Sequence, residues 1–175
     1  SDHTDRGQKT GKVVLVDVYN GRGMNGVQRG EVKKLLVLES LPKPINFTGG
    51  MDPLTYGGSF TLERVLGTVP VEPDGSAFVE LPAMRSLFFV ALDKNELAVK
   101  RMQSFLSGLP GEVTSCAGCH ENRTETTQCS HDLEALARPA SRIEPYQDCP
   151  DVFDFPRDIQ PILDRVKSRL DAKLN

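Results

Sequence analysis

Short strand patterns bounded by polar turns constrain the fold of this chain more than any other feature. They are rich in β-branched and apolar residues and occupy residues 60–71, 77–82, 86–92 and 97–105. The turn Glu72-Pro73-Asp74-Gly75-Ser76 separates the first two, because proline fixes φ and the Asp-Gly pair supplies the bend. Strands at such close spacing predict an antiparallel β-sandwich, with 97–105 as its last strand.

Two further strand patterns precede this series, at residues 12–19 and 31–39. The Gly-rich stretch 20–30 between them is interpreted as a flexible connection, since no helix pattern follows it. A second long polar excursion covers residues 46–59. The 12 prolines and 15 glycines of the chain favour short strands and turns over a helical bundle.

The chain changes character after the cluster Gly108-Leu109-Pro110-Gly111. Residues 131–138 show one or two turns of helical propensity, and residues 158–170 form an amphipathic helix with Pro161 in its first turn. The apolar face of that helix carries Ile159, Ile162, Leu163, Val166 and Leu170.

The expected fold is mainly β: an antiparallel β-sandwich, Ig-like or prealbumin-like, with a C-terminal helix. The loop region between them contains Cys116-Ala117-Gly118-Cys119-His120, the attachment pattern of c-type haem, and is therefore expected to be a c-type haem-binding loop region. We expect four parts along the chain. These are a flexible N-terminus at 1–11, a sandwich module at 12–107, a haem-attachment and disulfide loop region at 108–152, and the amphipathic helix at 153–175.

The motif Cys116-Ala117-Gly118-Cys119-His120 carries the chemistry of the chain. Two cysteines separated by two residues and followed by histidine form the attachment pattern of c-type haem. Each thiol can add across one haem vinyl group, and His120 is the expected proximal iron ligand. The alternatives are a thioredoxin-like redox pair, a structural disulfide or half of a zinc site.

The distal iron ligand is expected to be Met102 or His131. Met102 has core packing as its alternative role, and His131 could equally be a surface residue at a helix N-terminus. Other candidates, none favoured by sequence, are Met24, Met51, Met84 and His3. Arg123 could pair with a haem propionate or lie solvated at the surface.

Cys129 and Cys149 are left over once the motif is assigned. An even remainder in an exported protein predicts a disulfide between them. A zinc site using Cys129, His131 and Cys149 is the alternative, although the spacing matches no recognised ligand set.

The net charge of −3 argues against nucleic acid and anionic membrane surfaces as partners. No apolar run is long enough to span a bilayer, so no transmembrane segment is expected. The polar N-terminus is not a signal peptide. Because haem is attached to such motifs outside the cytoplasm, we expect a periplasmic or otherwise exported protein whose signal has been removed.

Two stretches carry a family resemblance: Leu66-Gly67-Thr68-Val69-Pro70-Val71-Glu72-Pro73-Asp74-Gly75-Ser76-Ala77 and Ser115-Cys116-Ala117-Gly118-Cys119-His120-Glu121. They resemble the haem-binding middle region of the hydrazine synthase alpha subunit and related exported planctomycete-type c-type cytochrome proteins. The resemblance implies a β-rich module with one covalently attached haem c in a loop at its edge. Residues 153–165 are similar to the first helix of a following cytochrome c domain, although no second cysteine pair comes after them.

One departure from that family concerns the iron. The resemblance implies an iron-ligating tyrosine a few residues after the motif, whereas Thr124 occupies that region here. The sequence therefore favours ligation by His120 and a mono-haem electron-transfer protein, free or as a subunit of a larger redox complex, rather than a catalyst. Its partner would be a redox protein or a neighbouring haem subunit. The alternatives are a haem enzyme or sensor with an open iron site, and a haem-free module held by a disulfide or zinc.

Overall fold

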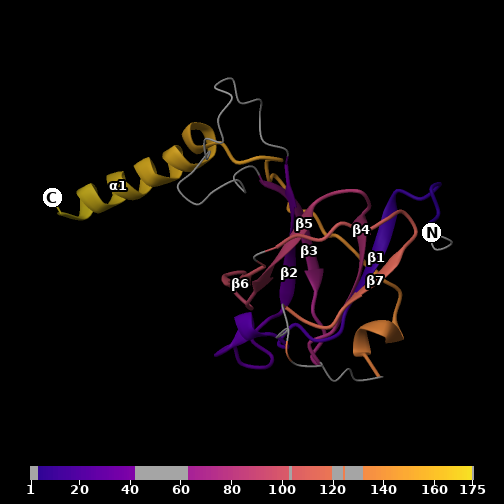
Figure 1. The fold of residues 1–175 in the computed structure, drawn as a ribbon. Helices are drawn as coiled ribbons and strands as arrows, with labels where there is room; N and C mark the ends of the chain where they lie inside the picture. The colour runs from indigo at the N-terminus through magenta and orange to yellow at the C-terminus, as the bar shows by residue number, and fades with distance from the viewer. Residues whose placement is uncertain (1–3, 42–62, 103, 120–123, 125–131, 175) are drawn as a thin grey trace.

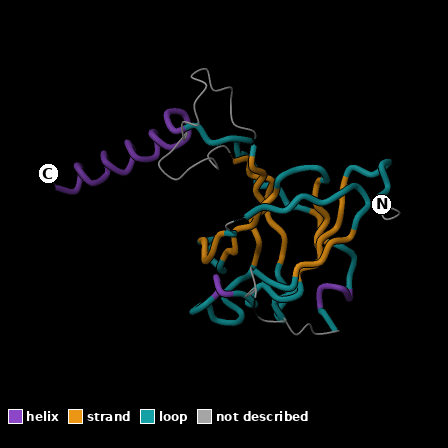
Figure 2. The backbone as a smooth tube through the Cα atoms, viewed as in Figure 1, coloured by secondary structure: helices purple, strands orange, loops and turns teal. Residues whose placement is uncertain are grey.

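Two four-stranded sheets packed face to face form the body of the protein (Figures 1 and 2). The structure is a computed structural model, and it describes residues 4–41, 63–102, 104–119, 124 and 132–174. Sheet A has the order β7-β1-β4-β8, and sheet B has the order β3-β2-β5-β6. The strands of sheet A are β1 (Thr10–Leu15), β4 (Ala77–Pro82), β7 (Val113–Cys116) and β8 (Ser141–Arg142). Those of sheet B are β2 (Lys34–Ser40), β3 (Glu63–Pro70), β5 (Leu87–Leu92) and β6 (Ala98–Arg101).

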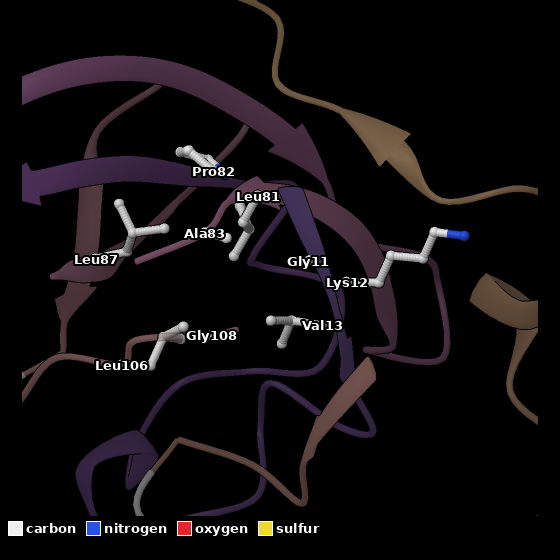
Figure 3. Close-up of a pocket in the computed structure, with 9 residues that line it drawn as sticks. All are labelled: Gly11, Lys12, Val13, Leu81, Pro82, Ala83, Leu87, Leu106 and Gly108. Carbon is white, nitrogen blue, oxygen red and sulfur yellow. The ribbon is translucent and has the colours of Figure 1, made fainter. Parts of the chain in front are cut away.

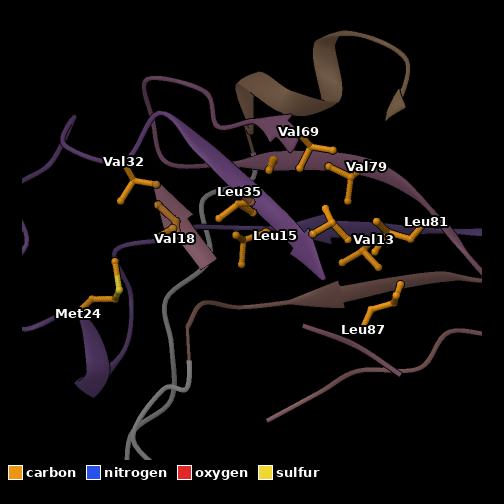
Figure 4. Close-up of a cluster of buried hydrophobic side chains, with 13 residues drawn as sticks. Val13, Leu15, Val18, Met24, Val32, Leu35, Val69, Val79, Leu81 and Leu87 are labelled. Atoms are coloured by element: carbon orange, nitrogen blue, oxygen red, sulfur yellow. The ribbon is translucent and has the colours of Figure 1, made fainter. Parts of the chain in front are cut away.

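The core lies between the sheets because one side of each central strand is apolar. In β4, Ala77, Val79 and Leu81 are buried, while the residues between them are only half-buried. In this core cluster, drawn in Figure 4, side chains from both sheets meet three from the connection between β1 and β2, namely Val18, Met24 and Val32. The members of the cluster are Val13, Leu15, Val18, Met24, Val32, Leu35, Val37, Val69, Ala77, Val79, Leu81, Leu87 and Ala91. Each fully buried valine or leucine stabilises the fold by roughly 1.5–3 kcal/mol.

Sheet B also buries apolar side chains outside the core cluster. Leu38, Phe88, Val90 and Leu92 form a second cluster, which we call the outer cluster, and Met102 packs against it. The Arg101 guanidinium lies over the Phe88 ring, 4.8 Å from its centroid. Burial on both faces explains why β5 reads as a continuous apolar run rather than an alternating one.

The predicted mainly β sandwich is confirmed, but the expectation that 97–105 is its last strand is wrong. Sheet B is antiparallel throughout, whereas β7 and β8 join sheet A after that point and pair in parallel with β1 and β4. Parallel strand pairs are not joined by hairpin turns, so no turn motif in the sequence predicts them. The region 108–152, predicted to pack on the sandwich as loops, therefore contributes two strands to it.

The segment after β8 links the two sheets along one side of the sandwich. β8 pairs with β4 in sheet A, and Glu144 then exchanges two main-chain hydrogen bonds of 2.8 and 2.9 Å with Thr68 of β3 in sheet B. Gly67, with φ of +135°, permits this approach, because a Cβ there would overlap the Glu144 carbonyl. The edge of β3 is thereby covered.

The part of the chain that the structure describes has three 3₁₀ or π turns and one longer helix, all outside the sheets. The turns are η1 (Arg22–Met24), η2 (Glu134–Ala137) and η3 (Phe155–Ile159), and η3 leads into the helix α1 (Gln160–Leu174). The predicted C-terminal helix is thus confirmed, and the helical propensity of 131–138 yields only the short turn η2.

Helix α1 directly continues η3 and extends away from the two sheets (Figure 1). Its predicted apolar face is largely solvent-exposed: Ile162, Leu163, Val166 and Leu170 are 48–58% exposed. No helix among the described residues is long and apolar enough to cross a membrane.

Candidate haem-attachment site

Strand β7 places the first cysteine of the motif at the edge of sheet A. Its last residue, Cys116, pairs with Leu15, the last residue of β1. The Val16 N–H extends this pairing by donating to the Cys116 carbonyl at 2.9 Å. The first thiol is therefore carried by regular secondary structure rather than by a free loop.

Asn20 holds the turn that separates the two cysteines. Its carbonyl accepts a 2.7 Å hydrogen bond from the Cys119 N–H, and its side-chain amide donates to the Ala117 carbonyl at 3.4 Å. Gly118 lies against the Asn20 main chain so closely that a Cβ there would overlap the Asn20 carbonyl oxygen. The residues between the thiols are thus fixed against the loop that follows β1.

The two thiols lie half-buried beside the core cluster, and neither forms a disulfide. Burial, together with the nearby Cys116 and Asp17, raises the pKa of the Cys119 thiol to about 11, and burial is the largest of these causes. At neutral pH this side chain is therefore a protonated thiol rather than a thiolate.

The β3–β4 turn forms hydrogen bonds to two segments that lie next to the motif in space or in sequence. Its Gly75 carbonyl accepts from the Val18 N–H at 2.8 Å, which fixes the loop after β1. On its other side, Asp74 Oδ2 accepts from the Glu134 N–H at 3.0 Å, and Ser76 Oγ accepts from the Ala135 N–H at 3.1 Å. One turn therefore anchors both the loop that holds the motif and the segment, η2, that follows it.

The structure does not describe most of the other predicted site residues. His120, Arg123, Cys129 and His131 lie outside the described residues. Met102, by contrast, packs against the outer cluster, whereas both motif cysteines pack against the core cluster. The distal roles of Met102 and His131 stay predictions.

Two further methionine and cysteine positions can be placed. Met24 is 4% exposed and belongs to the core cluster, on which the motif thiols also pack. Cys149 is half-buried and its Sγ lies 3.7 Å from the Pro150 carbonyl, to which it can donate. Cys149 forms no disulfide in the structure and Cys129 is not described, so the predicted pairing of the two is not confirmed.

Sequence reasoning missed Asn20, which it placed in a flexible connection. A single sequence carries no signal for a side chain that contacts a motif about a hundred positions downstream, because the contact depends on the parallel pairing of β1 with β7. Gly118 lies inside the motif, but only the structure shows why its missing side chain matters.

A small apolar hollow lies at the other end of β1, away from the thiols (Figure 3). Gly11, Val13, Leu81, Leu87 and Leu106 are among its lining residues. Since Cys116 pairs with Leu15 at the opposite end of the strand, this hollow is not part of the candidate site.

The described part of the motif fits a covalently attached haem. Two half-buried thiols, separated by a turn of fixed conformation, lie beside an apolar surface, as thioether attachment requires. Within the described ranges no group of three or more His, Cys, Asp or Glu side chains could hold a metal ion. That leaves zinc binding without support from these residues.

Comparisons with known proteins agree with this geometry. The family profile of the hydrazine synthase alpha subunit middle domain matches residues 30–121, more than half of the chain. The chain also resembles the solved structure described as Kuenenia stuttgartiensis hydrazine synthase, with a TM-score of 0.70 and 19% identity. That match covers 90% of this chain but only 29% of the solved chain, and at this identity it shows a shared fold. No curated protein matches. The chain belongs to the family of the hydrazine synthase alpha subunit middle domain.

Proposed function

We propose that this protein is a mono-haem c-type cytochrome that acts in electron transfer. The observation that carries the proposal is the placement of Cys116 and Cys119 at the end of β7, joined by a turn bonded to Asn20. In this proposal the two thiols form thioether bonds and His120 binds the iron. The group they hold would supply an iron that gains and loses one electron.

The rest of the chain would act on this group through its polar and apolar surroundings. Arg123 would pair with a propionate by a charge-assisted hydrogen bond. Met102 or His131 would complete the iron coordination, and a methionine there would raise the potential while a histidine would lower it. The core cluster beside the thiols would exclude water from one side of the site.

The setting of the protein is part of the same proposal. Its family is named for a subunit, and the solved relative is several times longer than this chain, which supports a role within a larger redox assembly. A neighbouring haem subunit or a redox protein would be its partner. Because haem is attached to such motifs outside the cytoplasm, the proposal includes export.

Maturation in a periplasmic expression system tests attachment directly. We expect the purified wild-type chain to gain the mass of one haem and to give a pyridine haemochrome spectrum with both vinyl groups saturated. Cys116→Ala and Cys119→Ala should each lose one thioether bond, while Cys149→Ala, a matched thiol outside the motif, should not change the spectrum. A wild-type chain without covalent haem contradicts the proposal and leaves the haem-free module.

Family membership favours one alternative, a haem enzyme or sensor with an open iron position. Carbon monoxide separates it from the carrier, since an iron with two protein ligands binds the gas poorly. Rapid, saturable binding to the reduced protein would support the open site, and a spectrum unchanged by carbon monoxide would support the carrier.

A further inference from the structure

We propose that Asn20 is a positioning residue that presents the two motif thiols at the spacing needed for double attachment. The inference rests on the proposed haem attachment and adds a residue that lies far from the motif in sequence. According to this inference, the loop after β1 helps to hold the motif in a fixed conformation, and the motif does not do so alone.

The geometry ties three consecutive motif residues to one asparagine. The Asn20 carbonyl accepts from the Cys119 N–H at 2.7 Å, and its side-chain Nδ2 donates to the Ala117 carbonyl at 3.4 Å. Between these two contacts, Gly118 packs directly on Asn20, and a Cβ at residue 118 would lie 2.8 Å from the Asn20 Cβ. Real Cβ atoms essentially never approach so closely.

The loop that carries Asn20 is itself held in place. The Asn20 N–H donates to the Asp17 carbonyl at 3.1 Å, which closes a turn. The Val18 N–H donates to Gly75, and the Val16 N–H donates to Cys116. Asn20 therefore transmits the position of sheet A and of the β3–β4 turn to the second thiol.

Fixed spacing matters because attachment consists of two additions to one molecule. In each, the thiol Sγ forms a bond to one carbon of a vinyl group and the thiol proton ends on the other carbon. No group leaves and no electrons are exchanged with an outside reagent. After the first addition the second is intramolecular, so its rate depends on how well the turn orients the remaining thiol.

Two substitutions test the role from opposite sides. Gly118→Ala forces the motif off the Asn20 main chain, and Asn20→Ala removes the side-chain hydrogen bond but keeps the carbonyl. Gly108→Ala and Asn95→Ala are matched controls, because a Cβ at residue 108 meets nothing within 4 Å and Asn95 lies exposed in a polar turn.

We expect protein with only one thioether bond to accumulate in Asn20→Ala and Gly118→Ala. It would be seen as a pyridine haemochrome band shifted by one unsaturated vinyl group. Loss of one hydrogen bond predicts a fall of about threefold to tenfold in the ratio of double to single attachment for Asn20→Ala. Gly118→Ala should lower the ratio further, and both controls should match the wild type. Equal ratios in all five proteins overturn the proposal.

Amide hydrogen exchange of the haem-free chain gives a second measurement that does not depend on attachment. The Cys119 amide should be protected in the wild type and should exchange faster in Gly118→Ala. An unprotected Cys119 amide in the wild type overturns the positioning role of Asn20, even if haem is attached. A protected amide in a wild-type chain that takes up no haem overturns the proposed function, and this inference with it.

Discussion

Asp74 connects the β3–β4 turn to the segment that follows the cysteine motif. Its Oδ1 accepts from the Ser76 N–H at 2.8 Å and from the Ser76 hydroxyl at 2.6 Å, while Oδ2 accepts from the Glu134 N–H. Burial by itself raises the pKa of this carboxyl, but the hydrogen bonds from Ser76 and Glu134 outweigh it and hold the pKa below 3.8.

This shift predicts a pH-dependent contribution to stability. Because the folded pKa lies below the unfolded one, the contribution is present above pH 3.8 and is lost as the pH falls through the folded pKa. Asp74→Ala should therefore lower the free energy of unfolding by about 1–2 kcal/mol at pH 7, through the lost hydrogen bonds. Urea unfolding at pH 7 and in acid should show the difference from wild type shrinking as the carboxyl protonates.

A control for this prediction is Asp151→Ala. The side chain of Asp151 is 83% exposed, and its ion pair with Arg64 is 3.8 Å long. Such an exposed pair contributes little. If the Asp74 variant shows the same small loss at both pH values, the hydrogen-bonded carboxylate does not stabilise the turn.

At the scale of elements, the same leucine-to-alanine substitution should cost much more stability in a central strand than in the C-terminal helix. Leu35 in β2 is 2% exposed, whereas Leu163 in α1 is 49% exposed. Leu35→Ala should cost about 3 kcal/mol or more through a cavity in the core cluster. Leu163→Ala should change the free energy of unfolding by less than about 0.5 kcal/mol. Chemical denaturation followed by fluorescence or circular dichroism measures both, and a large loss for Leu163→Ala would show that α1 packs on the sheets.

Elements with a local signal could be predicted from the sequence. The run 77–82 coincides with β4, because alternation and the Pro-Asp-Gly turn are both local. Within the run 97–105 the structure assigns only β6 (Ala98–Arg101) as a strand, although Met102 still donates its N–H to the Phe89 carbonyl of β5. Strands β7 and β8 could not be found, because parallel edge pairing of such short segments depends on β1 and β4 being in place.

The candidate site also has a part that could be predicted from a local sequence signal and a part that could not. Cys116 and Cys119 could be predicted, because the haem-attachment motif consists of four consecutive positions followed by a histidine. Their support by Asn20 and by the Asp74–Ser76 turn could not be predicted, because it joins segments that only the sandwich brings together. The residue types at 72–76 predicted a turn, but they did not predict which other segments the turn would contact.

For the whole molecule, the sandwich and α1 should differ in how far they resist opening. Strand β2 lies between β3 and β5 and contributes Leu35 and Val37 to the core cluster, so its amides should exchange only when the whole sandwich unfolds. Helix α1 continues η3 with its apolar side chains largely exposed, and an isolated helix of its 15 residues is marginal in water. Hydrogen exchange by mass spectrometry should therefore show α1 exchanging far faster than β2. Equal protection of the two segments would contradict this.

The parallel pairing of β1 with β7 also sets an order of events in time. Strand β1 is made early, yet its two partners, Ala77–Pro82 and Val113–Cys116, come much later in the chain. The loops that must close are long, and long-range pairing slows folding. Sheet A consequently cannot be completed before β8 (Ser141–Arg142) has been made and has paired with β4. The fixed spacing of the two cysteines joins β7 to the loop that carries Asn20, so the chain cannot set it until residue 119, far downstream of β1, has been made.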